Sequence, residues 1–223
     1  MNYIFHFPPY YFFLKQIDPN FVPSITLYMS LIGQKTKSDF IEWDKLQTLT
    51  QKLERDGDWK FTLLITIGMY TGLRISDILS LKWFQLLNME HIEVTEKKTK
   101  KVRKILVNQQ LQETVSRISS KLTHLNPDQF IFLNRFRTKP ISSQYVNWKL
   151  KELVKKYEVV KDNTKIKSHS LRKSFGRRVW ENSERSEKGL IMLNEIFNHS
   201  NIKTTKIYLG IRDKEIQDVY QSL

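Results

Sequence analysis

Residues 59–74 have the sequence WKFTLLITIGMYTGLR, and this stretch decides which kind of core the chain builds. Its first twelve residues are apolar on nearly every side of a helix, which predicts a helix that is buried all round. Asp58 before it is a suitable N-terminal cap, and Thr71 and Gly72 mark its end. Because Arg74 follows this buried helix directly, we expect its guanidinium to be held near the core.

The patterns on either side of this stretch are mainly helical. A preceding helix can be capped by Ser38 or Asp39, has one apolar face and stops at Gly57. That face consists of Leu46, Leu49 and Leu53. Further helical patterns cover residues 75–81, 109–122, 142–159, 169–182, 187–197 and 203–209.

The apolar period changes from helical to alternating after the short helix that begins at residue 75. Ile92 and Val94 alternate with polar residues, and so do Ile105 and Val107, which predicts two strands joined by a turn. Residues 127–134 predict one more short extended piece. The expected fold class is therefore α+β, mostly α, with a small antiparallel sheet.

The charge of the chain points to a polyanionic partner. The 223 residues carry 37 Lys and Arg against 23 Asp and Glu, a net charge of +14 with a pI near 9.8. Nucleic acid is the first candidate partner and an anionic membrane surface the second, while a basic surface that only confers solubility is the plain alternative. No run of about 18 apolar residues exists, so we expect no membrane span.

The chain contains no cysteine, which excludes disulfides and thiolate zinc sites and fits a reducing, cytoplasmic location. Residues 1–34 differ from the rest because they hold nine of the 27 aromatic residues and have no net charge. All of the +14 therefore lies in residues 35–223. We expect residues 1–34 to form a separate aromatic-rich segment ahead of one domain over 35–223.

The turn between the two expected strands is strongly basic. Residues 97–104, KKTKKVRK, hold six basic residues and no acidic one. A solvated loop tip explains this composition adequately. A basic hairpin is also a shape that can enter a groove of DNA, and a lysine in it can deliver a proton to a leaving oxygen.

Two spaced pairs combine an arginine with a second ionisable group. Arg74 and Asp77 lie three residues apart, within reach on one helix face, and a surface ion pair is their plain interpretation. A guanidinium fixed by a carboxylate is also a rigid fork for phosphate oxygens. His169 and Arg172 have the same spacing at the start of a helix that Ser168 can cap, where anions are favoured. Alone, a His-x-x-Arg pair is weak evidence for a functional site, and its role is usually structural.

Residues 198–210, NHSNIKTTKIYLG, contain His199 and, nine residues later, Tyr208. A tyrosine at helical spacing usually packs in a core, and alone Tyr208 favours that interpretation. With two arginines, two histidines and a basic hairpin, it completes a set that can stabilise charge on a phosphate. The sequence has no convincing metal-ligand spacing and no Walker loop or G-x-S-x-G motif, so we expect neither a metal nor a cofactor.

These motifs resemble those of the tyrosine recombinases, also called phage-type integrases. Residues 71–83, TGLRISDILSLKW, resemble the first arginine box of the family, and residues 169–175, HSLRKSF, resemble its His-x-x-Arg box. Residues 197–208, FNHSNIKTTKIY, resemble the box that holds a second histidine and the nucleophilic tyrosine. The resemblance covers about residues 38–223 and implies the catalytic-domain fold of that family, the DNA breaking-rejoining type.

The resemblance assigns roles position by position. The catalytic residues it implies are Arg74, Lys98, His169, Arg172, His199 and Tyr208, with Asp77 as the acidic companion of the first arginine. Lys97 competes with Lys98 for the role of hairpin lysine, because the register within a run of lysines is ambiguous. The DNA contacts we expect are Lys97, Lys100, Lys101, Arg103, Lys173 and Arg177.

The reaction implied by the resemblance is site-specific recombination of double-stranded DNA. Tyr208 would attack a scissile phosphate and give a 3′-phosphotyrosine and a free 5′-hydroxyl, while His169 would help take its proton. Both arginines and the second histidine would hold the nonbridging oxygens, and Lys98 would protonate the leaving oxygen. Two other functions stay open: a type IB topoisomerase-like nicking-closing enzyme, and a catalytically impaired DNA-binding remnant of an integrase.

The sequence departs from the family pattern in two places. Phe197 and Asn198 replace the usual Leu-Gly before the second histidine, and we expect little harm because asparagine tolerates a left-handed turn. Most family members carry a core-binding domain ahead of the catalytic one. Residues 1–34 are too short for it, so they are expected to be either a remnant of such a domain or the start of a compact member.

The resemblance also implies a homotetramer on two synapsed DNA sites, in a bacterial or phage protein with no membrane association. Residues 212–223 have a net charge of −1 and so do not suit DNA contact. One side of a short helix there can be formed by Ile211, Ile216, Val219 and Tyr220. This tail is expected to dock on a neighbouring protomer, with folding back on its own core as the near-even alternative.

Overall fold

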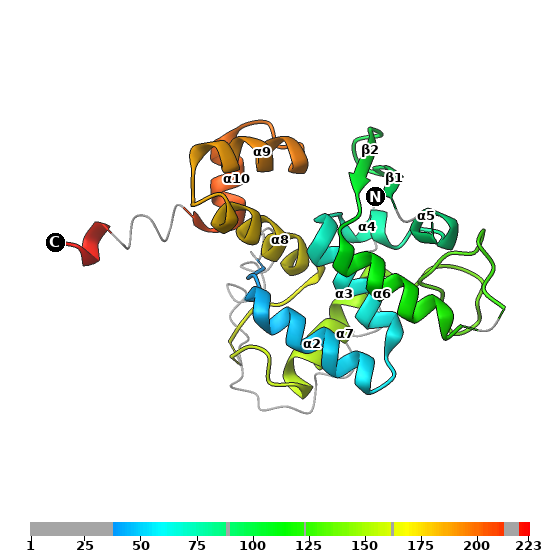
Figure 1. The fold of residues 1–223 in the computed structure, drawn as a ribbon. Helices are drawn as coiled ribbons and strands as arrows, with labels where there is room; N and C mark the ends of the chain where they lie inside the picture. Colours follow the sequence, from blue (N-terminus) through cyan, green and yellow to red (C-terminus); the bar gives the residue numbers. More distant parts are fainter. Residues whose placement is uncertain (1–37, 88–89, 123, 162, 212–218) are drawn as a thin grey trace, which may run out of the picture. The chain divides into compact units, whose positions relative to one another are not determined.

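Helix α3 (Trp59–Thr71) is buried on almost every side, as its sequence predicts (Figure 1). Asp58 caps its start by accepting a hydrogen bond from the Phe61 amide at 3.2 Å. Gly72 ends it in a left-handed conformation with a φ of 60°. The predicted bounds of this central helix are confirmed, because both of its ends are set by local capping chemistry.

The computed structural model describes residues 38–223 except 88–89, 123, 162 and 212–218, and Ser38–Leu223 form one compact unit. The expected segment over residues 1–34 lies outside the described residues. No helix in the described part of the chain is long and apolar enough to span a membrane.

Four helices pack around α3 or its neighbours. They are α2 (Trp43–Arg55), α6 (Gln109–Ser120), α7 (Ser143–Lys156) and α8 (Ser168–Asn182). The predicted apolar face of α2 is fully buried, but its predicted caps are wrong. The Asp39 carboxylate accepts instead from the Lys165 amide at 2.8 Å, and the Ser38 carbonyl accepts from the Lys173 ammonium at 2.7 Å. These long-range contacts hold the residues before α2 away from the helix, which begins at Trp43.

The predicted hairpin is present as an antiparallel pair, β1 (His91–Thr95) and β2 (Val102–Leu106), with His91 opposite Leu106. Ile92 and Val94 on β1 are buried against the core. Two short helices, α4 (Ile75–Ile78) and α5 (Trp83–Leu87), lie between α3 and the hairpin along the chain. The helix predicted over residues 75–81 is therefore shorter than expected.

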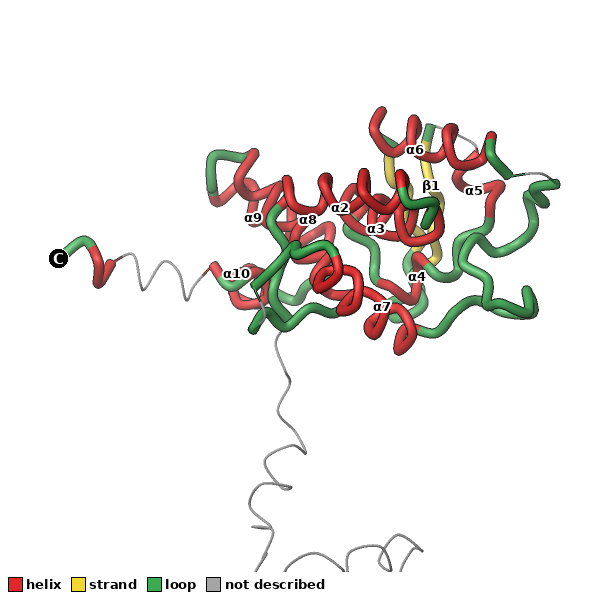
Figure 2. The backbone as a smooth tube through the Cα atoms, turned by 90° about the horizontal axis from the view of Figure 1, so that it is seen from below, coloured by secondary structure: helices red, strands yellow, loops and turns green. Residues whose placement is uncertain are grey.

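Helices α8, α9 (Glu187–Phe197) and α10 (Ile202–Leu209) form the C-terminal part of the domain around a second apolar cluster. Figures 1 and 2 show α8 running from the helices around α3 to the α9–α10 pair. The cluster consists of Trp180, Leu190, Leu193, Phe197, Leu209 and Ile211. Ser168 lies inside α8 and does not cap it, since Lys167 is the residue before the helix.

The predicted apolar face of the tail is only partly described. Ile211 is buried in the second cluster, which supports folding back at this residue. Val219 and Tyr220 are exposed, and Ile216 lies outside the described residues.

The cap of α3 leads to a stability prediction. Asp58→Ala should lower the free energy of unfolding by about 1 kcal/mol, because the Phe61 amide loses its partner. Asp58→Asn should stay close to the wild type, since asparagine caps equally well. Asp44→Ala, in the first turn of α2 and exposed, is the matched control, with an expected loss of a few tenths of a kcal/mol. Urea unfolding measures all three, and equal losses for Asp58→Ala and Asp44→Ala would contradict the role of the cap.

Candidate active site

Arg172 is the most deeply buried of the six predicted catalytic residues, with 3% of its surface exposed. It projects from α8, and its Nη1 donates to the carbonyl of Gly72, just after α3. Its Nη2 donates at 3.1 Å to the carbonyl of Phe197, the last residue of α9, and its guanidinium carbon lies 4.3 Å from the centre of the Phe197 ring. Burial lowers the pKa of Arg172 to about 10, so the side chain is still cationic at neutral pH.

Arg74 reaches the same carbonyl from the other side of the site. It is the residue before α4, and its Nη2 donates to the Phe197 oxygen at 3.3 Å. Its Nη1 donates to the Glu96 carboxylate at 2.7 Å in a half-buried ion pair. Two guanidiniums that are 98 residues apart in the sequence (172 minus 74) therefore meet at one backbone oxygen.

Asp77 is not paired with Arg74, although the three-residue spacing suggested it. Asp77 is fully buried, and its Oδ1 accepts from the amide of Lys97 at 3.0 Å. The side chain therefore fixes the first residue of the basic turn. Its expected role as companion of the first arginine is taken by Glu96, which sequence reasoning missed.

Glu96 is a buried carboxylate at the base of the hairpin turn, with 1% of its surface exposed. Besides Arg74, it accepts from Arg103 Nη1 at 3.2 Å and from the Thr99 hydroxyl at 2.7 Å. Burial alone would raise the pKa of Glu96. The hydrogen bonds from Thr99 and Arg74, with the charge of Arg74, outweigh burial and hold that pKa below its ordinary value. One signal was visible in the sequence: Glu96 is the acid next to a run of basic residues.

Tyr208 lies on α10 with its ring packed and its oxygen at the site. The ring makes edge contacts with Phe197 and His199, at centroid distances of 5.5 and 5.3 Å. The hydroxyl is buried and makes no hydrogen bond of normal geometry to any residue that the structure describes. Burial raises the pKa of Tyr208 to about 12, while the charges of Arg172 and Arg74 and a weak hydrogen-bonding interaction with the Arg172 guanidinium, outside normal geometry, oppose that rise.

Both histidines are neutral at pH 7. His169 lies in the first turn of α8 and is exposed, yet desolvation by nearby atoms, followed by the charges of Arg172 and Lys173, lowers its pKa. His199 is half-buried in the turn between α9 and α10. Burial, followed by the charges of Arg172, Arg74 and Lys98, lowers the pKa of His199 to about 4.

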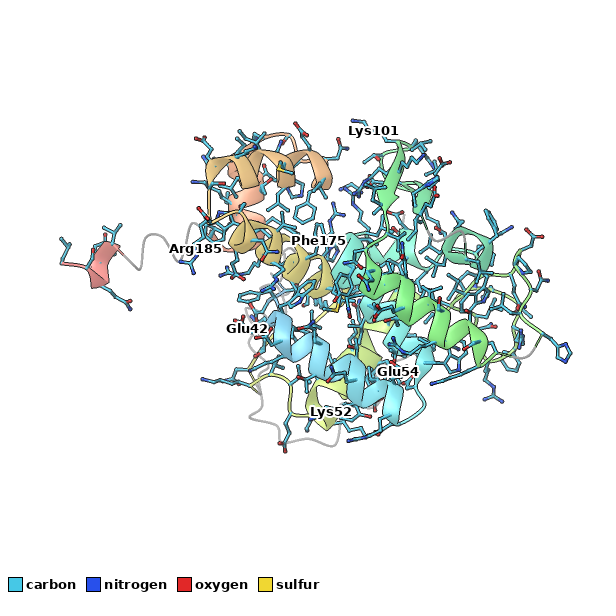
Figure 3. All side chains as sticks on the ribbon, viewed as in Figure 1. Glu42, Lys52, Glu54, Lys101, Phe175 and Arg185 are labelled. Atoms are coloured by element: carbon cyan, nitrogen blue, oxygen red, sulfur yellow. The ribbon has the colours of Figure 1, made fainter. Side chains whose placement is uncertain are left out.

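The basic turn reaches the C-terminal part of the site. Lys97, Lys98 and Lys100 are exposed, and the charge of Lys98 is close enough to affect His199. The Lys101 ammonium donates to the Asn198 side chain at 3.0 Å, and Figure 3 shows Lys101 at the free end of the hairpin, pointing toward α9. Asn198 has a φ of 49°, so it supplies the left-handed turn that was expected of it.

Two of the six predicted DNA contacts are buried. The Lys173 ammonium donates to the Ser38 carbonyl, and Arg177 donates to the Leu209 carbonyl at 3.3 Å with its guanidinium over the Phe40 ring. Their burial argues against a direct DNA contact and gives both side chains a part in packing α8. Within the described residues, no group of three or more His, Asp or Glu side chains is arranged to hold a metal ion.

Comparison with known proteins identifies the class of this fold and site. The model of the phage integrase family matches residues 39–215. A probable integrase/recombinase, YoeC, of Bacillus subtilis is 28% identical over 184 residues, which cover 80% of this chain and 92% of that protein. A tyrosine recombinase of Thermosipho africanus is 28% identical over 187 residues, which cover 83% of this chain and 62% of that protein. XerD of Lacticaseibacillus casei is 31% identical over 156 residues, which cover 67% of this chain and 50% of that protein.

Solved structures show the same fold. The XerA recombinase superposes with a TM-score of 0.62 at 19% identity, covering 82% of this chain and 64% of that one. The Tn1549 transposon integrase in complex with circular intermediate DNA gives a TM-score of 0.58 at 23% identity, again covering 82% and 64%. The chain thus spans most of the Bacillus relative and between half and two thirds of the others.

This protein belongs to the phage integrase family. Its predicted fold class is confirmed, and it has the catalytic domain of a tyrosine-type site-specific recombinase.

Glu96 leads to a prediction about stability and pH. Its lowered pKa means that the carboxylate contributes stability above its unfolded value of 4.5, and this stability is lost as the pH falls through the folded value. Glu96→Gln should lower the free energy of unfolding at pH 7 by about 1–3 kcal/mol and flatten its decline below pH 5. Glu93→Gln, on an exposed residue of β1, is the matched control. Urea unfolding from pH 3 to 7 tests this, and equal curves for the two variants would rule it out.

Proposed function

We propose that this domain cleaves and rejoins double-stranded DNA with Tyr208 as the nucleophile, through a 3′-phosphotyrosine and a free 5′-hydroxyl. The observation that carries the proposal is the Tyr208 hydroxyl. It is buried, has no hydrogen-bond partner of normal geometry among the described residues, and lies near two fixed cations. A tyrosine with only a packing role would normally find a partner for its oxygen when buried.

Arg74 and Arg172 are the groups that would stabilise the negative charge on the phosphate. Each guanidinium has five N–H donors, and the contacts described above with backbone and carboxylate oxygens leave further donors on both. Both are anchored before any substrate binds, so they need little reorganisation when charge develops. Their positions fit a clamp on the nonbridging oxygens.

Proton transfer has to accompany the attack. With a pKa of about 12, Tyr208 is protonated at neutral pH and must lose its proton as the bond to phosphorus forms. Two neutral histidines are available as acceptors, and the family pattern assigns this task to His169. Lys98, exposed in the basic turn, is the expected donor to the leaving 5′-oxygen.

The proposed partner is DNA in a bacterial or phage setting. A net charge of +14 suits a polyanion, and the related XerH recombinase and Tn1549 integrase were solved bound to DNA. We also propose that four copies act together on two synapsed sites in the cytoplasm. Residues 35–223 would be the catalytic domain in this scheme.

Tyr208→Phe tests the nucleophile, because it removes one oxygen and keeps the packed ring. A suicide DNA substrate should trap covalent protein–DNA complex with the wild type and none with the variant, while the Kd for DNA changes less than about threefold. Tyr220→Phe, on an exposed tyrosine, is the control and should trap normally. Covalent complex formed by Tyr208→Phe would exclude this nucleophile. No trapping by the wild type would favour the DNA-binding remnant. If the wild type does trap DNA, an assay with two recombination sites separates a recombinase from a topoisomerase.

The hairpin lysine has its own test. Lys98→Ala should slow cleavage of normal DNA by about 10²-fold or more, since general acid catalysis is worth about 10²–10⁴. A substrate with sulfur in place of the leaving 5′-oxygen should restore the rate, because a thiolate leaves without a proton. Lys97→Ala is the matched neighbour and should show neither effect. If the sulfur substrate restores the cleavage rate of Lys97→Ala instead, Lys97 is the general acid. If it restores neither variant, the basic turn only contacts DNA.

A further inference from the structure

Behind His199 lies a chain of three hydrogen bonds that the reaction scheme does not yet use. His199 Nδ1 lies 3.0 Å from the hydroxyl of Thr205, on α10. The same hydroxyl donates at 3.0 Å to Oδ1 of Asn194, on α9. Asn194 Nδ2 donates in turn to the backbone carbonyl of His199 at 3.2 Å. Thr205 is fully buried.

Counting protons along this chain fixes the tautomer of His199. A backbone carbonyl only accepts, so the Asn194 amide must present its nitrogen to His199 and its oxygen to Thr205. An amide oxygen also only accepts, so the single proton of the Thr205 hydroxyl points to Asn194. The Thr205 oxygen can then only accept from His199, and Nδ1 of the neutral ring must carry the proton.

The opposite tautomer would be costly at this place. It would set the Nδ1 lone pair against the lone pairs of the Thr205 oxygen, or turn the hydroxyl away and leave Asn194 Oδ1 without its donor. Thr205 is fully buried, so water cannot easily replace the lost partner. An unsatisfied buried polar group costs about 1–3 kcal/mol, enough to make one tautomer dominate.

We propose that Asn194 and Thr205 are positioning residues that hold His199 as the Nδ1–H tautomer, so that its Nε2 enters the reaction as a proton acceptor. This inference rests on the proposed function and changes one part of it: it assigns the role of proton acceptor to His199 in place of His169. The Tyr208 proton passes to Nε2 as the bond from the Tyr208 oxygen to phosphorus forms. The bond from phosphorus to the 5′-oxygen breaks, and that oxygen takes its proton from Lys98. His199 then carries an Nε2–H that can donate to a nonbridging oxygen.

The surroundings of His199 fit an acceptor role. The charged groups that act on it are Arg172 from α8, Arg74 from the start of α4 and Lys98 from the hairpin, all cationic. Burial and, after it, these cations lower the pKa of His199 and keep the ring neutral until an anion is bound. Tyr208, on α10, meets the ring edge to face, so donor and acceptor residues are neighbours.

Long-range proton–nitrogen NMR on histidine-labelled, DNA-free protein tests the tautomer directly, with His199→Gln identifying the signal. In the wild type, His199 should show a protonated Nδ1 and an unprotonated Nε2. Thr205→Val, which keeps the shape of the side chain, should mix the tautomers and slow single-turnover covalent complex formation by about 10- to 100-fold with the Kd for DNA unchanged. Thr205→Ser, which keeps the hydroxyl, should behave as the wild type.

Thr204→Val is the matched control, because its hydroxyl lies on the same helix and bonds only to Asn201 in the described structure. It should leave both the tautomer and the rate unchanged. An Nε2–H tautomer in the wild type, or equal behaviour of Thr205→Val and Thr204→Val, would overturn the proposal. The NMR result needs neither DNA nor a variant of Thr205, so it stands apart from the Tyr208 test. A wild-type Nδ1–H signal together with covalent trapping by Tyr208→Phe would reject the proposed nucleophile alone.

Discussion

The carbonyl oxygen of Phe197 is the point on which the arrangement of the site depends. It accepts hydrogen bonds from both Arg74 and Arg172, which lie 98 residues apart in the sequence (172 minus 74). Two cations held at one oxygen repel each other, and the repulsion is stronger in the protein than in bulk water because the effective dielectric is lower. The carbonyl lies at the C-terminal end of α9, where the helix dipole is negative, and the Glu96 carboxylate adds a full negative charge on one side. These groups together let the two guanidiniums remain side by side without a ligand.

Phe197 also connects this charge arrangement to the nucleophile. Its carbonyl holds the arginines, while its ring packs against Tyr208 and His199 in the second apolar cluster. A shift of α9 would therefore move the cations and the tyrosine relative to each other. Gly176 on α8 allows this packing, since a Cβ there would lie 2.8 Å from the Phe197 ring. The site is thus built where the two apolar clusters of the domain meet, with one residue belonging to both the packing and the chemistry.

Sequence reasoning succeeded where the deciding interaction is local. The ends of α3 followed from Asp58 and Gly72, and the hairpin followed from alternating residues, because caps and strand periods act over a few positions. It failed where a distant segment offers a better partner. Asp77 is well spaced for Arg74 but binds the turn backbone, and Arg74 takes Glu96, 22 residues away. Of the predicted site, the resemblance gave the positions, but neither spacing nor resemblance could show that Lys173 and Arg177 are buried or that Thr205 stands behind His199.

The charge balance of the site explains why its protonation states suit a phosphate that has yet to bind. In the free protein, burial and the surrounding cations keep both histidines neutral, and burial keeps Tyr208 protonated despite those cations. A bound phosphodiester would bring a negative charge among the same groups. Opposite charge favours the charged form of a histidine, so on the proposed function the pKa of His199 should rise when DNA binds. The ring would then accept a proton more readily in the complex than in the free protein. Binding of the substrate would therefore itself make His199 a stronger base.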